Sequence, residues 1–303
     1  MKFGKVPETQ ISNIDFSLPA EPAFNATILP GKPVQTPKVY IGCAKWGVPE
    51  WIGKIYPTQV KEKDFLEHYV KHYNTIELNA THYKVYDEAT IQKWADKVGN
   101  KDFIFCPKMY KGISHEGNLL DKKELTDEFL KNITAFKNHL GPIFIQLNET
   151  FSPGRKNELF TFLGSLPKIF QFFVEVRHPD WFSNAAIKNE LFAVLKNLNI
   201  GAVITDTSGR RDCVHMHLTN SQTFIRYVSN CLHETDYVRI DGWIERIKFW
   251  VQNGLQEIYF FIHMEDEIFS PELTVYVVDK LNAALGLQLE KPKFIAVQPG
   301  LFG

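Results

Sequence analysis

Polar and charged side chains stand at or near the ends of several short apolar runs in this sequence. Carboxylates at such positions could act as general acids or bases, and arginines could stabilise negative charge on a ligand. Lys108 follows the apolar run FIFCP, where it could bind an anion or, with a lowered pKa, act as a base. The residues that end these runs are Glu77, Asn79, Lys108, Gln146, Glu175, Arg177, Asp206 and Arg226.

Side chains alternate between the two faces of an extended strand, so residues two positions apart share a face. Glu77 and Asn79 are therefore neighbours on one strand, and Glu175 and Arg177 are neighbours on another. A buried carboxylate is costly unless it is paired or hydrogen-bonded, so two interpretations stay open for Glu175 and Arg177. They belong to an active site, or they are partners in a structural ion-pair network.

Eight runs rich in Val, Ile, Phe and Tyr have the continuous apolar character of parallel strands that are buried on both faces. Helical patterns lie between most of them, including stripes over 125–140 and 240–251. Ser270 is the expected N-cap of a last helix, with Pro271 at its first position. The gap between the sixth and seventh runs shows no clean helix. The expected strands span residues 39–44, 74–79, 102–108, 142–147, 172–177, 202–206, 223–228 and 258–263.

Eight strand-then-helix units in series predict an α/β protein with a single (β/α)8 TIM barrel over residues 38–303. An open doubly wound sheet would carry a glycine-rich first turn, and Gly42, Gly47 and Gly53 do not form GxGxxG. Residues 1–37 hold six prolines and no sustained apolar pattern, which predicts an irregular, extended arm that wraps the domain or stays mobile. In a TIM barrel the loops after the strands carry the chemistry, so the polar strand ends should converge at one mouth.

Composition and charge narrow the class of protein. Lys plus Arg number 34 and Asp plus Glu number 35, so no global basic excess attracts nucleic acid or anionic lipid. The four cysteines form no CxxC and are expected to be free thiols in a reducing compartment. No apolar run approaches the ~20 residues that span a membrane, and the first residues lack the apolar segment of a signal peptide. We therefore expect a cytoplasmic protein without a membrane partner.

A metal site is one alternative chemistry. His215 and His217 form HxH, whose imidazoles would share one side of an extended segment, but they lie away from a clear strand end. A second possible ligand set ends four strands and comprises Glu77, Glu175, Asp206 and His263. Lys108 and Arg177 would bring positive charge into the same mouth, so neither a metal nor another cofactor is predicted.

Glycoside cleavage and phosphate binding are two further alternatives. A glycosidase needs two carboxylates about 5–10 Å apart. Strands four and seven end in Gln146 and Arg226, which leaves Glu175 and Asp206 as the possible pair. Residues 265–267, Glu-Asp-Glu, would repel phosphate from the last loop. An anion could still be bound from the other side by Arg210, Arg211 and Arg226.

Aromatic residues offer an alternative to an enzyme. Several lie in loops beside lysines and arginines, where they could stack on bases or sugars or hold a protein partner. They could equally form a hydrophobic rim that covers the core. The balanced charge disfavours nonspecific nucleic-acid binding. These residues are Trp46, Trp51, Tyr56, Tyr83, Tyr110 and Trp181.

Six motifs follow one another between about residue 39 and about residue 265: GCAKWGVPEWIGKIYP, TIELNATHY, FCPKMYKGISHEGNL, GPIFIQL, FFVEVRHPDW and ITD. The series, with its E-x-N-x-x-x-Y and E-x-R-x-x-x-W cores, resembles the domain-of-unknown-function 72 family, the YecE-like proteins. The resemblance implies a TIM-barrel fold and no established activity. The family's motif positions fall here on Trp46, Tyr56, Glu77, Asn79, Tyr83, Lys108, His115, Gln146, Glu175, Arg177, Trp181 and Asp206.

The chain departs from the family pattern in its seventh and eighth strands. Where the family tends to carry Arg-x-His-Gly and Phe-Asn-Asn, this sequence has residues 226–229, Arg-Tyr-Val-Ser, and 261–263, Phe-Ile-His. The N-terminal arm lies outside the resemblance.

We predict an enzyme of unknown reaction, a hydrolase, lyase or isomerase, that acts on a small polar or sugar-like ligand at the barrel mouth. Glu77 or Glu175 would be the general acid or base, Lys108 and Arg177 would stabilise negative charge, and Asp206 would assist. The alternative is a non-catalytic protein that binds a nucleic acid or a protein through its aromatic and basic rim. The predicted ligand contacts are Trp46, Asn79, Tyr83, His115, Gln146, Trp181 and Arg226.

Overall fold

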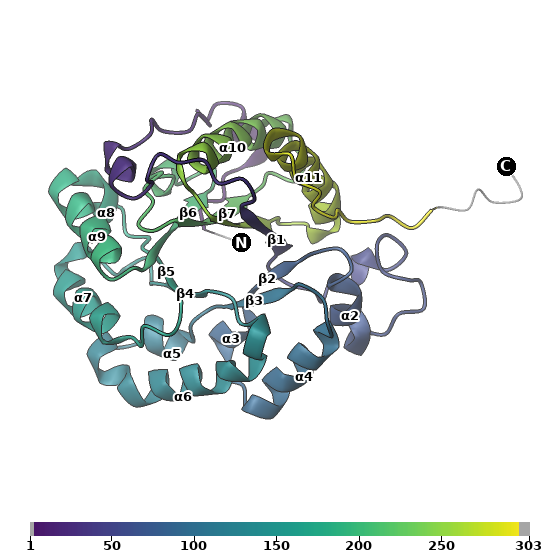
Figure 1. Ribbon diagram of the computed structural model, residues 1–303, viewed down its shortest axis with the longest axis horizontal. Coiled ribbons are helices and arrows are strands. Elements are labelled where there is room, and N and C mark those ends of the chain that lie inside the picture. Colours follow the sequence, from purple (N-terminus) through teal and green to yellow (C-terminus); the bar gives the residue numbers. More distant parts are fainter. Residues whose placement is uncertain (1–2, 297–303) are drawn as a thin grey trace, which may run out of the picture.

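Eight parallel strands form the centre of the molecule (Figure 1). The structure is a computed structural model that describes residues 3–296. Each strand coincides with one of the apolar runs, and nearly all of their residues are buried. The strands are β1 Lys38–Cys43, β2 Thr75–Leu78, β3 Ile104–Pro107, β4 Ile143–Gln146, β5 Phe172–Glu175, β6 Gly201–Asp206, β7 Gln222–Val228 and β8 Glu257–His263.

The strands form two sheets and not one closed barrel. Six of them make a curled parallel sheet in the order β1-β8-β7-β6-β5-β4, and β2 and β3 make a separate two-stranded sheet. Between β3 and the six-stranded sheet there are isolated bridges, such as that from Lys108 to Phe144, in place of a ladder. The prediction of a closed (β/α)8 TIM barrel is therefore wrong, because the larger sheet is a half-barrel whose edges do not pair continuously with β2 and β3.

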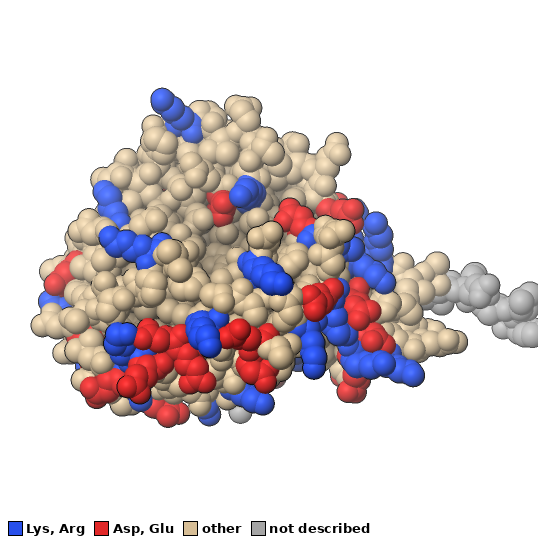
Figure 2. All heavy atoms as spheres, turned by 60° about the horizontal axis from the view of Figure 1, so that its bottom comes forward, with Lys and Arg blue, Asp and Glu red and all other residues tan. Residues whose placement is uncertain are grey.

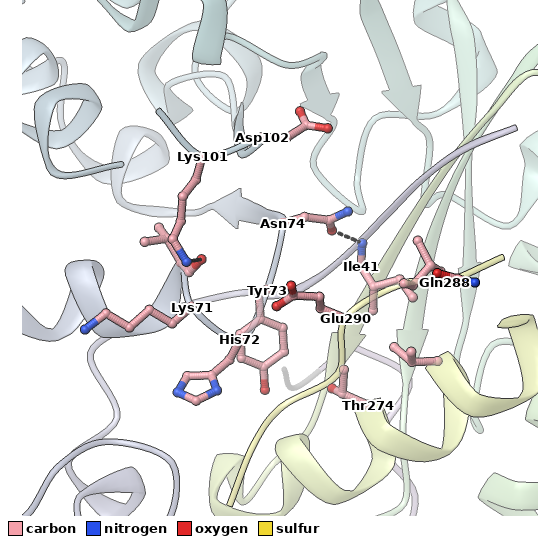
Figure 3. A pocket seen from close by; sticks show the side chains of 13 residues that line it. Ile41, Lys71, His72, Tyr73, Asn74, Lys101, Asp102, Thr274, Gln288 and Glu290 are labelled. Atoms are coloured by element: carbon pink, nitrogen blue, oxygen red, sulfur yellow. Dashed lines mark hydrogen bonds between the residues drawn. The ribbon is translucent and has the colours of Figure 1, made fainter. Parts of the chain in front are cut away.

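Side chains replace backbone hydrogen bonds at the seam between β1 and β2. The Asn74 carboxamide donates from Nδ2 to the Val39 carbonyl at 2.7 Å and accepts from the Ile41 amide at 2.8 Å (Figure 3). A Cβ on Gly42 would lie 2.1 Å from the Thr75 carbonyl oxygen, so only glycine permits this close approach. The edge of β1 is thereby satisfied without a ladder to β2, which is why the larger sheet ends here.

A buried tyrosine makes the second link across the same seam. The Tyr69 hydroxyl accepts from the Cys43 amide at 2.8 Å and donates to the Thr75 carbonyl at 3.0 Å. Its ring stacks on that of Tyr73, with the centroids 4.5 Å apart. One hydroxyl therefore satisfies a backbone group from each sheet.

Helices cover the outer faces of the strands, and the stripes expected on residues 125–140 and 240–251 lie largely against the core. Between β6 and β7 the described chain has only the 3₁₀ turn η7 Arg211–Cys213, as the weak pattern there indicated. Ser270 is the first residue of the last helix and not its N-cap, which is Phe269. The α-helices are α1 Glu8–Ile11, α2 Phe65–Tyr69, α3 Ala80–Tyr83, α4 Glu88–Val98, α5 Lys111–Ser114, α6 Lys123–Ile133, α7 Lys156–Ser165, α8 Asp180–Ser183, α9 Ala185–Asn197, α10 Glu234–Asn253 and α11 Ser270–Leu285.

Aromatic rings fill the inside of the half-barrel. The Phe224 centroid lies 5.2 Å from that of Phe144, 5.3 Å from that of Phe173 and 4.7 Å from that of Phe261. The next side chain on the same face lies two positions further along each strand. The layer that covers these rings at the carboxyl ends is therefore polar, and it contains Gln146, Glu175, Thr205, Arg226 and His263.

The N-terminal arm packs against the fold over its described residues. It includes α1 and a 3₁₀ helix, η1 Ala23–Thr27, so it is not extended throughout. Glu21 accepts hydrogen bonds from Arg246 at 3.0 Å and from the Trp250 indole at 2.9 Å, which places the purple arm beside α10 in Figure 1. Residues 1–2 of the predicted arm and 297–303 of the predicted domain lie outside the described residues.

The seam predicts different effects for two neighbouring tyrosines. Tyr69→Phe would leave two buried backbone groups without a partner and should lower the free energy of unfolding by about 2–4 kcal/mol. Tyr73→Phe is the matched control, because the buried Tyr73 hydroxyl makes no hydrogen bond to the described residues, and it should change stability by less than about 1 kcal/mol. Urea denaturation measures both, and equal losses would contradict this account of the seam.

Candidate functional site

Arg226 joins two buried glutamates at the carboxyl ends of the strands. Its Nε and Nη2 donate to the Glu77 carboxylate at 2.7 and 2.8 Å, and its Nη1 donates to Glu175 at 2.7 Å. The three side chains are at most 2% exposed. Glu77 lies in the two-stranded sheet, whereas Glu175 and Arg226 lie in the larger one, so this ion network links the two sheets.

Glu77 has further partners from two other elements. His263 of β8 places its Nε2 2.8 Å from one carboxylate oxygen, and Asn79 donates to the other at 3.0 Å. Burial by itself would raise the pKa of Glu77, but the charge of Arg226, followed by His263, holds this pKa well below its ordinary range. Burial lowers the pKa of His263. Glu77 is therefore an ionised, fully bonded carboxylate.

Glu175 is equally well paired. Arg177 donates from Nε at 2.7 Å and Thr205 donates from its hydroxyl at 3.0 Å, both to the oxygen that Arg226 leaves open. Burial opposes ionisation, but the charges of Arg177 and Arg226 outweigh it and lower the pKa of Glu175 to about 2. Glu175 and Arg177 are thus direct ion-pair partners.

Lys108 is the cation of this site that does not contact a carboxylate. Its side-chain nitrogen donates to Gln146 Oε1 at 2.8 Å and lies 5.8 Å from the Phe144 ring centroid. Within residues 3–296 it forms no ion pair. The Arg226 guanidinium lies 5.5 Å from the same ring. Burial, and then the charge of Arg226, lower the pKa of Lys108 to about 7, so a large share of this amine is uncharged near neutral pH.

A short hydrogen-bonded chain leads from Lys108 to His115. Gln146 accepts from the lysine through its oxygen, so its amide nitrogen faces His115 Nε2 at 3.5 Å. His115 Nδ1 lies 2.8 Å from the Ser114 hydroxyl. Burial, and then the charge of Lys108, lower the pKa of His115 to about 4, so the imidazole is neutral near pH 7.

Asp206 lies on the other face of its strand, apart from this network. It accepts from the Trp243 indole at 2.7 Å and pairs with Arg239 at 2.9 Å and with Arg211. Arg239 and Trp243 belong to α10, so Asp206 fixes a helix to the sheet. Burial raises the pKa of Asp206, but Arg239 and then Arg211 outweigh it and lower the pKa. Thr205, one position earlier, faces the ion network instead.

The structure does not bring the predicted aromatic contacts into the site. Trp181 is fully buried and donates to the Phe151 carbonyl at 2.8 Å. Trp46 packs edge-on against Trp94 of α4, with the centroids 5.6 Å apart. Tyr83 is 68% exposed. The predicted ligand contacts that do gather around the ion network are Asn79, His115, Gln146 and Arg226.

The sequence analysis did not identify two residues of this site, and it considered a third only as a possible metal ligand. Phe144 underlies both Lys108 and Arg226, and Thr205 binds Glu175. His263 was the third, and it binds Glu77. The alternation of side chains along each strand could have identified all three, because residues an even number of positions apart share the inward face.

Metal-ligand geometry is not found in the part of the chain that the structure describes. No group of three or more His, Cys, Asp or Glu residues between 3 and 296 is arranged to hold an ion. His217 stacks on Phe192, with the centroids 4.1 Å apart, and the His215 ring lies 4.8 Å from the same phenyl group. Burial lowers the pKa of both histidines, which are part of an aromatic cluster.

A cavity of about 320 Å³ lies at the other end of the strands, beside the seam (Figure 3). Asn74 and Asp102 line it, and they precede β2 and β3. It is therefore separated from the ion network by the length of the strands.

Comparison with known proteins identifies the same family as the sequence motifs. The family described as "Protein of unknown function DUF72" matches residues 40–295. The UPF0759 protein YecE of Escherichia coli K12 is 28% identical over 265 residues, 82% of this chain and 94% of that protein. The UPF0759 protein YunF of Bacillus subtilis 168 is 26% identical over 156 residues, 48% of this chain and 52% of that protein.

Two solved structures of DUF72 family proteins share the fold. The one from Enterococcus faecalis V583 superposes with a TM-score of 0.63 at 14% identity and covers 86% of this chain and 100% of its own. The one from Thermotoga maritima superposes with a TM-score of 0.57 at 18% identity and covers 82% of this chain and 100% of its own.

The ion network predicts a large effect for a small change at Glu175. Glu175→Gln should lower the free energy of unfolding by about 3–5 kcal/mol, because it leaves buried arginines without their carboxylate. The pKa of Glu175 is about 2 when folded and 4.5 ordinarily, so its contribution is complete above pH 4.5 and is lost as the pH falls toward 2. The variant should therefore lose part of the acid dependence of stability.

Glu149→Gln is the matched control for this experiment. Glu149 lies 3.9 Å from Arg177, but its side chain is 59% exposed, so its removal should change stability by less than about 1 kcal/mol. Denaturant titration over a range of acidic pH values measures both variants. If the Glu175→Gln protein is as stable as the wild type, the charge of Glu175 does not contribute to the stability of the fold through this network.

Proposed function

The chain belongs to DUF72, a family of proteins of unknown function, and we propose that it is an enzyme whose acid/base group is Lys108. One observation carries the proposal. A lysine that is 7% exposed lies beside a paired ion network, bonded to an amide and not to a carboxylate, with its pKa lowered to about 7. An amine of this kind can gain and lose a proton near neutral pH, which is what a general base requires.

The two glutamates take a different role from the one that the sequence suggested. Glu77 and Glu175 have lowered pKa values and their oxygens are bonded, so neither is suited to deliver or take a proton near neutral pH. They hold Arg226 in position instead. Burial, followed by the charge of Arg226, then lowers the pKa of Lys108 to about 7, so both its charged and its uncharged forms are populated near neutral pH.

The substrate class follows from the groups around the amine. Lys108 would remove a proton from the carbon next to a carbonyl, and Arg177 would stabilise the negative charge that develops on the carbonyl oxygen as the enolate forms. The Asn79 amide and the neutral His115 imidazole offer hydrogen bonds to hydroxyl groups. A small polar hydroxycarbonyl compound, such as a sugar derivative, meets these requirements, and the reaction would be that of an isomerase or a lyase.

The face shown in Figure 2 gives no support to nucleic-acid binding as the main function. Figure 2 shows acidic and basic side chains interspersed on one face, with an acidic band along its lower part, so this face offers no continuous basic track for a phosphate backbone. Between residues 3 and 296, no helix has the length and apolar character needed to cross a membrane. The four cysteines are free thiols as expected, and a cytoplasmic location stays a prediction.

The pKa of Lys108 tests the proposal directly. Acetic anhydride acetylates only uncharged amines, so the pH dependence of labelling, read by mass spectrometry of peptides, reports the pKa of each lysine. Lys108 should titrate near pH 7, whereas the control Lys123, whose pKa is raised by Asp127 on the surface, should titrate above its ordinary 10.5. A Lys108 that titrates with the surface lysines would overturn the proposed function.

Two variants sharpen this test. Gln146→Glu places a carboxylate against the amine and should raise the pKa of Lys108, whereas Gln171→Glu, distant in the fold, should leave it unchanged. The folded pKa lies near 7 and the ordinary one is 10.5, so wild-type stability should rise with pH between these values. Lys108→Met should remove that rise, and a variant that keeps the full rise would exclude Lys108 as its source.

A further inference from the structure

The first described residues of the arm lie across the carboxyl ends of the strands. Phe3 is 7% exposed, and its ring centroid lies 4.1 Å from the Arg177 guanidinium carbon and 5.1 Å from that of Arg210. The Gly4 carbonyl accepts from the Gly209 amide at 2.7 Å. Lys5 pairs with Glu265 at 2.6 Å. Three consecutive residues thus bind three different loops.

The positions of these loops define what the arm covers. Arg177 follows β5, Gly209 follows β6 and Glu265 follows β8. Because the strand order is β8-β7-β6-β5, a segment that contacts all three loops must pass the end of β7, the strand that carries Arg226. The arm therefore lies over the side of the ion network that is built from the larger sheet.

We propose that residues 3–5 form a cap that closes the site of Lys108 and must leave for a ligand to enter. This proposal rests on the proposed function, since the cap would regulate access to that same site. Phe3 covers Arg177, the group assigned to the developing negative charge, so a ligand that uses Arg177 has to displace the ring.

The contacts of the cap suit a segment that opens. The Lys5 and Glu265 side chains are 54% and 64% exposed, so their ion pair contributes little. Behind the cap, a cavity of about 600 Å³ separates residues 4–8 of the arm from residues 228–233 after β7. Of residues 3–8 of the arm only Phe3 is buried, and segments with few buried apolar contacts open locally at low cost in free energy.

Gly4 provides a variant that opens the cap, and Gly31 provides its matched control. Gly4 has φ +68°, and a Cβ there would lie 2.4 Å from Thr207 Cγ2. Gly31 lies in the same arm with φ +73°, but a Cβ there would meet no atom within 4 Å. Gly4→Ala and Gly31→Ala thus impose similar backbone strain, and only the first forces the arm away from the loop after β6.

The test measures how fast reagents reach the site in the full-length protein. Phenylglyoxal reports Arg177, acetic anhydride reports Lys108, and peptide mass spectrometry gives both rates. Gly4→Ala should raise the two rates about tenfold, as expected when a local opening equilibrium shifts. Gly31→Ala should leave both at the wild-type rate. A second opening variant, Phe3→Ala, should act in the same direction as Gly4→Ala.

A buried thiol separates opening of the cap from loosening of the whole fold. Cys106 is fully buried inside the half-barrel, so its rate of alkylation should stay unchanged in Gly4→Ala. Equal Arg177 and Lys108 rates in the two glycine variants, or a Cys106 rate that rises with them, would overturn the cap. The pKa of Lys108 is read from the pH profile and not from these ratios, so failure of the proposed function and failure of the cap are distinguishable.

Discussion

The bidentate pairing of Arg226 with Glu77, and its third bond to Glu175, is the interaction on which the site depends. The negative charges of Glu77 and Glu175 are matched by the positive charges of Arg226 and Arg177, and all four side chains are buried. A further cation there has no carboxylate left to pair with. Lys108 is that cation, and burial, followed by the charge of Arg226, lowers its pKa to about 7. The network is thus the cause of the chemistry proposed for its neighbour.

The same network also has a structural role, because the fold is assembled from two sheets without a continuous ladder between them. Asn74 and Tyr69 join the sheets at the seam, and Arg226 joins them across the interior. These links are made by side chains, whereas at the other edge backbone hydrogen bonds from the Met109 amide to the Phe144 carbonyl and from the Gly141 amide to the Phe105 carbonyl join the sheets. Changes at the ion network should therefore affect stability and the position of Lys108 together.

The arm and the departures from the family pattern converge on this network. The match to DUF72 begins at residue 40, so the arm is an addition to the part of the chain that matches the family. Its first described residues nevertheless lie against Arg177. In β7, Arg226 occupies the arginine position of the family's Arg-x-His-Gly motif, whereas in β8 His263 stands where the family tends to carry Asn, and both bind Glu77.

The sequence predicted the eight strands and placed Glu77, Lys108, Gln146, Glu175 and Arg226 at or near their ends, because apolar runs and the two-residue alternation are local properties of the chain. The sequence did not predict that the barrel stays open. At the β1 edge this depends on Asn74 and Tyr69, which bond the backbone groups of β1 in place of β2. The sequence also did not separate Asp206, which turns outward to α10, from Thr205, which faces the network. Which carboxylates are paired, and that Lys108 is left without one among the described residues, was decided by tertiary structure, because charge pairing depends on distances between strands that are far apart in the chain.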